Sequence, residues 1–245
     1  MDKTKNGAWW PAILEKGFAK FYGNHVKLNG GDYVEALRTL TGAPIIKFNT
    51  TNQTEAELFA NISKNSNDSN LIMAIAEKDV DGLKNGTLYH IHKAMNITPV
   101  KTKPKATVQL IMLRSAEEKG DAYTGAWGQA DAKWTKALKK TLNLTGPLAD
   151  KDALDDQFFY MTAEDFKKAF GKYTVAQTNA TTSTKDVYPV VLAGHEAKFY
   201  FINPKKQAVS LSLDHVSKRM QLAACAKADN RYYVKVRDDK LEIVQ

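Results

Sequence analysis

Two histidines, His90 and His92, stand one residue apart in the segment TLYHIHKAMNI and are the first candidates for chemistry. The alternation of apolar and polar residues predicts a β-strand there, and positions i and i+2 of a strand point to the same face. Such a pair can ligate a metal ion or supply a general base. A metal site needs a third protein ligand, and no cysteine is near. We therefore expect no metal site and interpret the pair as ordinary strand residues.

The elements around this pair alternate between helices and strands, which predicts an α+β fold. Apolar residues recur at helical spacing in several segments, and Asp32, Thr54 and Thr162 stand where N-caps are expected, with Glu57 and Asp165 three residues after the two threonines. Helices are predicted within residues 9–23, 31–42, 54–67, 131–143 and 162–173, and strands within 70–78, 87–97 and 107–116.

A polar segment, AQTNATTSTKD at residues 176–186, is the best candidate for a linker between two domains. Residues 1–175 then form the mixed domain. Residues 187–245 are expected to form a small all-β, sandwich-like module, because short segments there alternate between apolar and polar residues. A module with so few short strands is near the lower limit for a β-sandwich that is stable by itself. The sequence therefore leaves open whether this module is complete.

The composition favours a folded, basic protein. Hydrophobic residues make up 43% of the 245 positions, and the formal net charge is +8, which favours acidic partners. The single cysteine, Cys225, excludes an intrachain disulfide. The first residues lack the apolar stretch of a secretory signal, and no apolar run approaches the roughly 18 residues of a membrane span. We therefore expect a cytoplasmic location.

Four motifs resemble the calpain-type cysteine protease family. They are WWPAILEKGFAKFYG at residues 9–23, GGDYVEALRTLTGAP at 30–44, TGAWGQADAKW at 124–134 and DDQFFYMTAEDFKKAF at 155–170. The resemblance implies the second lobe of a papain-like protease, an antiparallel sheet or barrel with helices. It also implies, more weakly, that the residues after the linker begin the family's β-sandwich domain.

The same resemblance indicates that the catalytic triad is lost. A papain-like protease needs a cysteine nucleophile, a histidine that lowers its pKa and a third residue that orients the imidazole. The family's cysteine belongs to a first lobe upstream of Trp10, and Cys225 lies on the other side. The histidine of the G-H-A-Y motif corresponds to Thr87, and the asparagine of L-R-N-P-W-G corresponds to Ser115. We therefore expect no proteolytic activity.

His90 cannot take over from Thr87, because three residues along a strand carry a side chain about 10 Å away and to the opposite face. The calcium site that the resemblance implies also departs from the family pattern. Its positions correspond to Ala122, Gln129, Phe158 and the retained Asp156, while Asp121, Asp131 and Asp155 stay open as substitutes. We expect that the calcium site is lost and that the protein needs no cofactor.

A basic loop is the candidate for partner binding. Residues 82–116 contain no Asp or Glu, and KTKPK places Lys101, Lys103 and Lys105 in the turn between two predicted strands. The loop is either a solvated hairpin tip or a docking patch for an acidic partner, such as a tubulin tail or, less favoured, an anionic membrane surface. Nucleic acid is not expected, because no aromatic residues are interleaved with the lysines and no recognition motif occurs.

These observations lead to one functional expectation and two alternatives. We expect a non-catalytic, calpain-like scaffold that binds other proteins. The resemblance to degenerate family members suggests a cytoskeletal setting, at microtubules, a cilium or a flagellum. The first alternative is half of a split protease whose partner supplies the cysteine. The second is a calcium- or lipid-binding membrane module that uses the β-sandwich.

Overall fold

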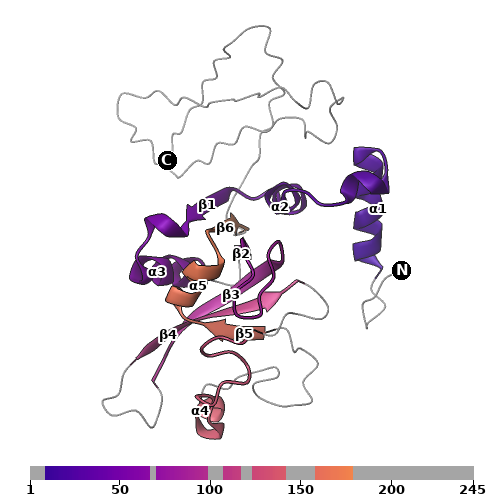
Figure 1. The fold of residues 1–245 in the computed structure, drawn as a ribbon. Coiled ribbons are helices and arrows are strands. Elements are labelled where there is room, and N and C mark those ends of the chain that lie inside the picture. The colour runs from indigo at the N-terminus through magenta and orange to yellow at the C-terminus, as the bar shows by residue number, and fades with distance from the viewer. Residues whose placement is uncertain (1–8, 67–69, 99–106, 117–122, 142–157, 179–245) are drawn as a thin grey trace, which may run out of the picture. The chain divides into compact units, whose positions relative to one another are not determined.

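The computed structural model describes residues 9–66, 70–98, 107–116, 123–141 and 158–178. Its centre is one antiparallel sheet with the strand order β1-β6-β2-β3-β4-β5 (Figure 1). The strands are β1 (Ile45–Asn49), β2 (Asn70–Ile75), β3 (Leu88–Ile97), β4 (Val108–Ser115), β5 (Phe158–Met161) and β6 (Lys172–Gln177). With the helices beside it, this sheet confirms the α+β class. The all-β module predicted at 187–245 lies outside the described residues.

The helices are α1 (Trp10–Tyr22), α2 (Tyr33–Thr41), α3 (Glu55–Asn65), α4 (Lys136–Thr141) and α5 (Ala163–Ala169), with 3-10 turns at His25–Leu28 and Thr50–Asn52. The chain divides into two compact units, one of residues 1–35 and 199–245 and one of residues 36–198. The sheet, α3, α4 and α5 belong to the second unit. Among the described residues, no helix is long and apolar enough to cross a membrane.

Local sequence sets where these helices begin. The Thr54 hydroxyl accepts the Glu57 N–H, and the Glu57 carboxylate accepts the Thr54 N–H at 2.8 Å, which completes the predicted capping box of α3. Thr162 caps α5 through the N–H of Asp165 at 3.2 Å. These contacts satisfy backbone donors that no helical carbonyl reaches.

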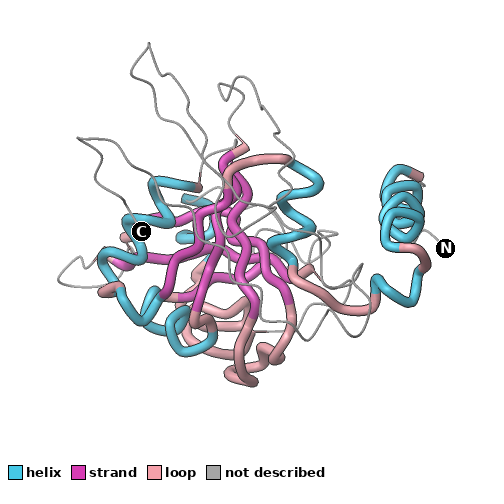
Figure 2. The backbone as a smooth tube through the Cα atoms, turned by 90° about the horizontal axis from the view of Figure 1, so that it is seen from above, coloured by secondary structure: helices cyan, strands magenta, loops and turns pink. Residues whose placement is uncertain are grey.

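The first face of the sheet carries the main core. Helices α3 and α5 lie side by side and pack on this face, and Figure 2 shows the strands beside them as one continuous sheet. Three aromatic rings join α5 to the sheet: the centroid of Phe166 lies 4.6 Å from that of Phe170 and 6.2 Å from that of Tyr173. Burial of this apolar surface is the main stabilising contribution to the fold.

The second face carries a smaller core over β3, β4 and β5. Trp127 and Trp134 stack edge to face with centroids 5.1 Å apart, and Tyr160 lies 5.1 Å from Trp134. The Trp134 indole N–H donates to the carbonyl oxygens of Trp127 and Gly128 at 3.1 and 3.0 Å. These bonds fix Trp134 within the loop of residues 127–134, because a buried indole N–H needs an acceptor, and both tryptophans of this loop pack on the second face.

Three strands of the sheet, β1, β5 and β6, follow no prediction from the sequence. β6 pairs with both β1 and β2, although its residues were expected to finish a helix and begin a linker. Ala176 and Gln177, the first two residues of the predicted linker, belong to β6. The segment KYTVAQ is short and its tyrosine and valine are fully buried, so its pairing depends on strands that are distant in the sequence.

Candidate functional site

Strands β3 and β4 bring Thr87 and Ser115 together at one end of the sheet. Ser115 is the direct cross-strand partner of Tyr89, and Thr87 precedes Tyr89 by two residues, so all three belong to the first face. The Ala76 N–H donates to the Thr87 carbonyl oxygen at 3.0 Å, which extends the ladder between β2 and β3 to Thr87. Thr87 is 6% exposed and Ser115 3% exposed. The two positions are therefore neighbours and enclosed.

A tight turn delivers the chain to Thr87. Val80 and Leu83 exchange two backbone hydrogen bonds, of 3.1 and 2.8 Å. Between them Asp81 and Gly82 both have positive φ, 47° and 85°, as a two-residue hairpin turn requires. Gly86 also has positive φ, 84°, and its N–H donates to the Ala76 carbonyl oxygen at 2.8 Å. The positive φ therefore explains why the residue before Thr87 is glycine.

The Thr87 and Ser115 side chains offer hydroxyl groups and no base. A threonine or serine hydroxyl does not accept a proton near neutral pH, so it cannot generate a thiolate from a cysteine. The neighbouring side chains on this face, those of Ala76, Tyr89 and Leu113, belong to the buried apolar cluster. Titratable groups at these two positions would have to ionise in an apolar environment.

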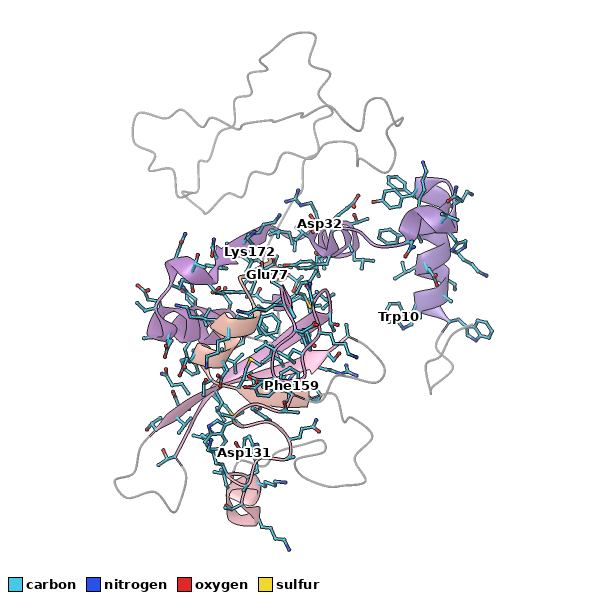
Figure 3. All side chains as sticks on the ribbon, viewed as in Figure 1. Trp10, Asp32, Glu77, Asp131, Phe159 and Lys172 are labelled. Carbon is cyan, nitrogen blue, oxygen red and sulfur yellow. The ribbon has the colours of Figure 1, made fainter. Side chains whose placement is uncertain are left out.

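Tyr123 adds no base to this face either. It packs on Phe159 with ring centroids 5.4 Å apart, and Figure 3 shows Phe159 within the body of the sheet. Burial, together with the carboxylates of Asp165 and Asp81, raises the pKa of Tyr123. The phenol is therefore neutral at physiological pH.

The histidine pair lies on the second face, as its spacing predicts. His90 is the direct cross-strand partner of Arg114, and a bulge between Ile91 and Lys93 inserts His92 on the same side. The ring centroids of His90 and His92 are 5.8 Å apart. Because Thr87 belongs to the first face, neither histidine can replace a base at that position.

Burial and nearby positive charge disfavour the protonated form of His90. Burial, and then the charges of His92 and Arg114, lower the pKa of His90. Within the described part of the chain, no group of three or more His, Cys, Asp or Glu side chains is placed to hold a metal ion. The expected absence of a metal site stays a prediction for the whole chain.

The described calcium candidates make other contacts. The Gln129 side-chain amide donates to the Phe158 carbonyl oxygen at 2.5 Å. The Asp131 carboxylate accepts the backbone N–H groups of Trp127 and Lys133 at 2.7 and 2.9 Å, and Figure 3 shows Asp131 in the segment that leads to α4. Asp131 therefore organises its own loop. The other calcium candidates, Asp121, Ala122, Asp155 and Asp156, lie outside the described residues, as do Lys101, Lys103, Lys105 and Cys225.

We predict a pH-dependent contribution of Asp131 to stability. Burial raises the pKa of Asp131, but the hydrogen bonds from Lys133 and Trp127 outweigh burial and lower it overall. Asp131→Asn is expected to reduce the free energy of unfolding by about 1–2 kcal/mol at pH 7. Because the folded pKa lies below the unfolded value of about 3.9, this difference is lost as pH falls through the folded pKa.

Urea unfolding of both proteins at pH 7 and near pH 3 measures this effect. Asp81→Asn is the matched control, because Asp81 lies exposed in a turn with positive φ that asparagine tolerates. A difference for Asp131→Asn that is equally large at both pH values would contradict the assignment.

Sequence reasoning missed two residues beside the histidines. The Arg114 guanidinium carbon lies 5.5 Å from the centre of the Phe158 ring, and the His92 ring lies 5.6 Å from it. Phe158 entered the sequence argument only as a calcium position, and Arg114 was not singled out there. Their meeting depends on the register of β3, β4 and β5, which no local pattern indicated.

Comparisons with known proteins agree with the motifs. A family model for calpain family cysteine protease matches residues 1–177. The chain is 23% identical over 194 residues to Calpain-A of Drosophila melanogaster, covering 76% of this chain and 23% of the relative. It is 26% identical over 190 residues to Calpain clp-4 of Caenorhabditis elegans, covering 74% and 25%, and 26% identical over 199 residues to human Calpain-9, covering 76% and 27%.

The chain thus spans about a quarter of the length of these relatives. The match extends from the helices before the sheet through β6, the last described strand, and includes Thr87, just before β3, and Ser115, at the end of β4. The chain therefore belongs to the calpain family of cysteine proteases.

Proposed function

We propose that this calpain-family chain does not cleave peptide bonds and acts as a binding scaffold. The observation that carries the proposal is the pair Thr87 and Ser115, buried just before β3 and at the end of β4, where the family motifs have histidine and asparagine. One such substitution removes the base, and the other removes the amide that orients it. A triad with either member lost retains only a small part of its rate.

The binding role is supported by charge. The net charge of +8 and the acid-free stretch of residues 82–116 favour an acidic protein surface as partner. We place the docking patch at Lys101, Lys103 and Lys105, in the segment between β3 and β4. An acidic cytoskeletal surface, such as a tubulin tail on a microtubule or axoneme, fits this chemistry, and the location would then be the cytoplasm. The scaffold needs no calcium or other cofactor.

Two measurements on the purified chain test this proposal. With and without calcium, the chain should show no cysteine-dependent hydrolysis of a fluorogenic peptide substrate. Any background hydrolysis should be unchanged by a cysteine-alkylating reagent. Microtubule co-sedimentation should weaken at least about fivefold when Lys101, Lys103 and Lys105 are changed to glutamate, and also when the acidic tubulin tails are removed.

The matched control changes Lys16, Lys20 and Lys27 to glutamate, because these lysines are equally numerous, exposed and in other elements. Turnover by the unchanged chain would overturn the non-catalytic role. Equal loss of microtubule binding in the two triple variants would show that only net charge matters. Calcium-dependent binding to anionic vesicles in place of microtubules would favour the membrane module.

A further inference from the structure

A row of side chains crosses the second face of the sheet and is basic wherever it is charged. The cross-strand pairs align Lys47, Thr174, Met73, His90, Arg114 and Phe158 from β1 to β5. None of the residues that the described register places on this face is Asp or Glu. The charged strand side chains that this register places on the second face are therefore all basic.

The basic groups converge on one aromatic ring. Arg114 is the cross-strand partner of both His90 and Phe158. Its guanidinium carbon lies 5.5 Å from the centre of the Phe158 ring, and the His92 ring packs on the same ring at 5.6 Å. We call His90, His92, Lys93, Arg114 and Phe158 the His–Arg patch.

The His–Arg patch is accessible from outside the sheet. His92 and Arg114 are exposed, and His90, Lys93 and Phe158 are half-buried. Helices α3 and α5 pack on the opposite face. The tryptophan cluster lies on the second face beside the patch; it also includes Ile97 of β3, and Phe158 packs against it. A strand face with an exposed guanidinium over an aromatic ring is preorganised, because the ring orients the guanidinium plane.

We propose that the His–Arg patch binds a carboxylate-rich peptide segment of a partner protein. This inference rests on the proposed binding role. It adds a second binding surface beside the lysine loop, and this surface lies within the described residues. The Arg114 guanidinium offers paired N–H donors that match a carboxylate, and protonated imidazoles of His90 and His92 add charge-assisted donors. Nucleic acid fits less well as a ligand, because bases bind by stacking on aromatic rings. The Phe158 ring of the patch already packs with Arg114 and His92.

The histidines make this binding depend on pH. Burial, His92 and Arg114 lower the pKa of His90, and a bound carboxylate favours the protonated imidazole, so binding takes up a proton. Affinity should therefore rise as pH falls from 8 toward 6, while glutamate carboxylates stay ionised. Burial raises the pKa of the neighbouring Tyr160 to about 12, so it stays neutral. Asp131 and Lys133, in the segment packed on this face, pair with each other at 3.4 Å.

The other described charged side chains on these elements are basic. They are the side chains of Lys47, Lys93, Arg114, Lys136, Lys139 and Lys172. Histidine is the residue type whose charge ordinarily changes between pH 8 and 6.

Fluorescence anisotropy with the full chain tests the proposal. The probe is a labelled ten-residue peptide rich in glutamate, with a glutamine-rich peptide of equal length as reference. At pH 6 and low salt, Arg114→Gln combined with His92→Gln should weaken binding of the glutamate peptide at least about fivefold. Arg38→Gln combined with His25→Gln removes the same residue types from other elements and should change affinity less than about twofold. His90→Gln should remove most of the gain between pH 8 and 6.

Each outcome bears on the proposal. Arg114→Lys keeps the positive charge but loses the paired N–H donors of the guanidinium, so it should give an intermediate affinity. This conservative variant also distinguishes a binding effect from a folding defect. Thermal melts followed by circular dichroism report folding directly. Equal binding of the two peptides, equal loss in the two double variants, or tighter patch-dependent binding of a short oligonucleotide or an anionic vesicle would overturn it. Failure here would leave the absence of proteolysis and the microtubule result standing, so the two proposals fail separately.

Discussion

A chain that carries Thr87→His and Ser115→Asn is expected to gain proteolytic activity when a cysteine-bearing first lobe from a calpain relative is supplied. With the same lobe, the unchanged chain should remain at least about 10³-fold slower, because triad members act as a unit and the loss of one removes most of the rate. Ser115 lies on β4 opposite Tyr89, beside the ladder position of Thr87, so the restored imidazole and amide would project from one face.

Hydrolysis of a fluorogenic peptide measures this gain, after co-purification shows that the lobe and the chain associate. Thr87→Gln with Ser115→Asn is the matched control, because glutamine approaches histidine in size and accepts no proton near neutral pH. Equal activity of the unchanged chain and the repaired chain would establish the split-protease alternative. No gain in an associated, folded, repaired pair would show that the two strands hold these positions differently from an active protease.

The second prediction with a large effect concerns the core under α5. Phe166→Ala is expected to reduce the free energy of unfolding by about 3–5 kcal/mol, because it removes a fully buried ring and leaves a cavity. The lost ring contacts join Phe166 to Phe170 and Tyr173, so the substitution weakens the attachment of α5 to the central strand β6. Urea unfolding followed by circular dichroism measures the change.

Phe21→Ala is the matched control, because the Phe21 side chain on α1 is 63% exposed. Its truncation should change the free energy of unfolding by less than about 1 kcal/mol. A Phe166→Ala variant as stable as the Phe21→Ala variant would contradict the placement of α5 against the sheet. Loss of the second-face tryptophan signal before the far-ultraviolet signal would show that the two cores unfold separately.

Local signals determined much of this protein. The capping box of Thr54 and Glu57 and the N-cap of Thr162 were predicted from spacing alone, because a cap involves only residues three positions apart. The strands β2, β3 and β4 were predicted from their own patterns of apolar residues. The alternation in β3 also determined that His90 and Thr87 belong to opposite faces, since that follows from the period of a strand. The family motifs identified the positions of Thr87 and Ser115.

Only the tertiary structure decided which strands are neighbours. β6 pairs with β1 and β2 through residues that are about 100 or more positions apart in sequence, and no short window of sequence contains both partners. For the same reason, the sequence predicted the histidine pair but not its meeting with Arg114 and Phe158. The His–Arg patch forms because β3, β4 and β5, from separate segments of the chain, pair in one register. The residue types, and the alternation of faces along each strand, were already determined by the sequence.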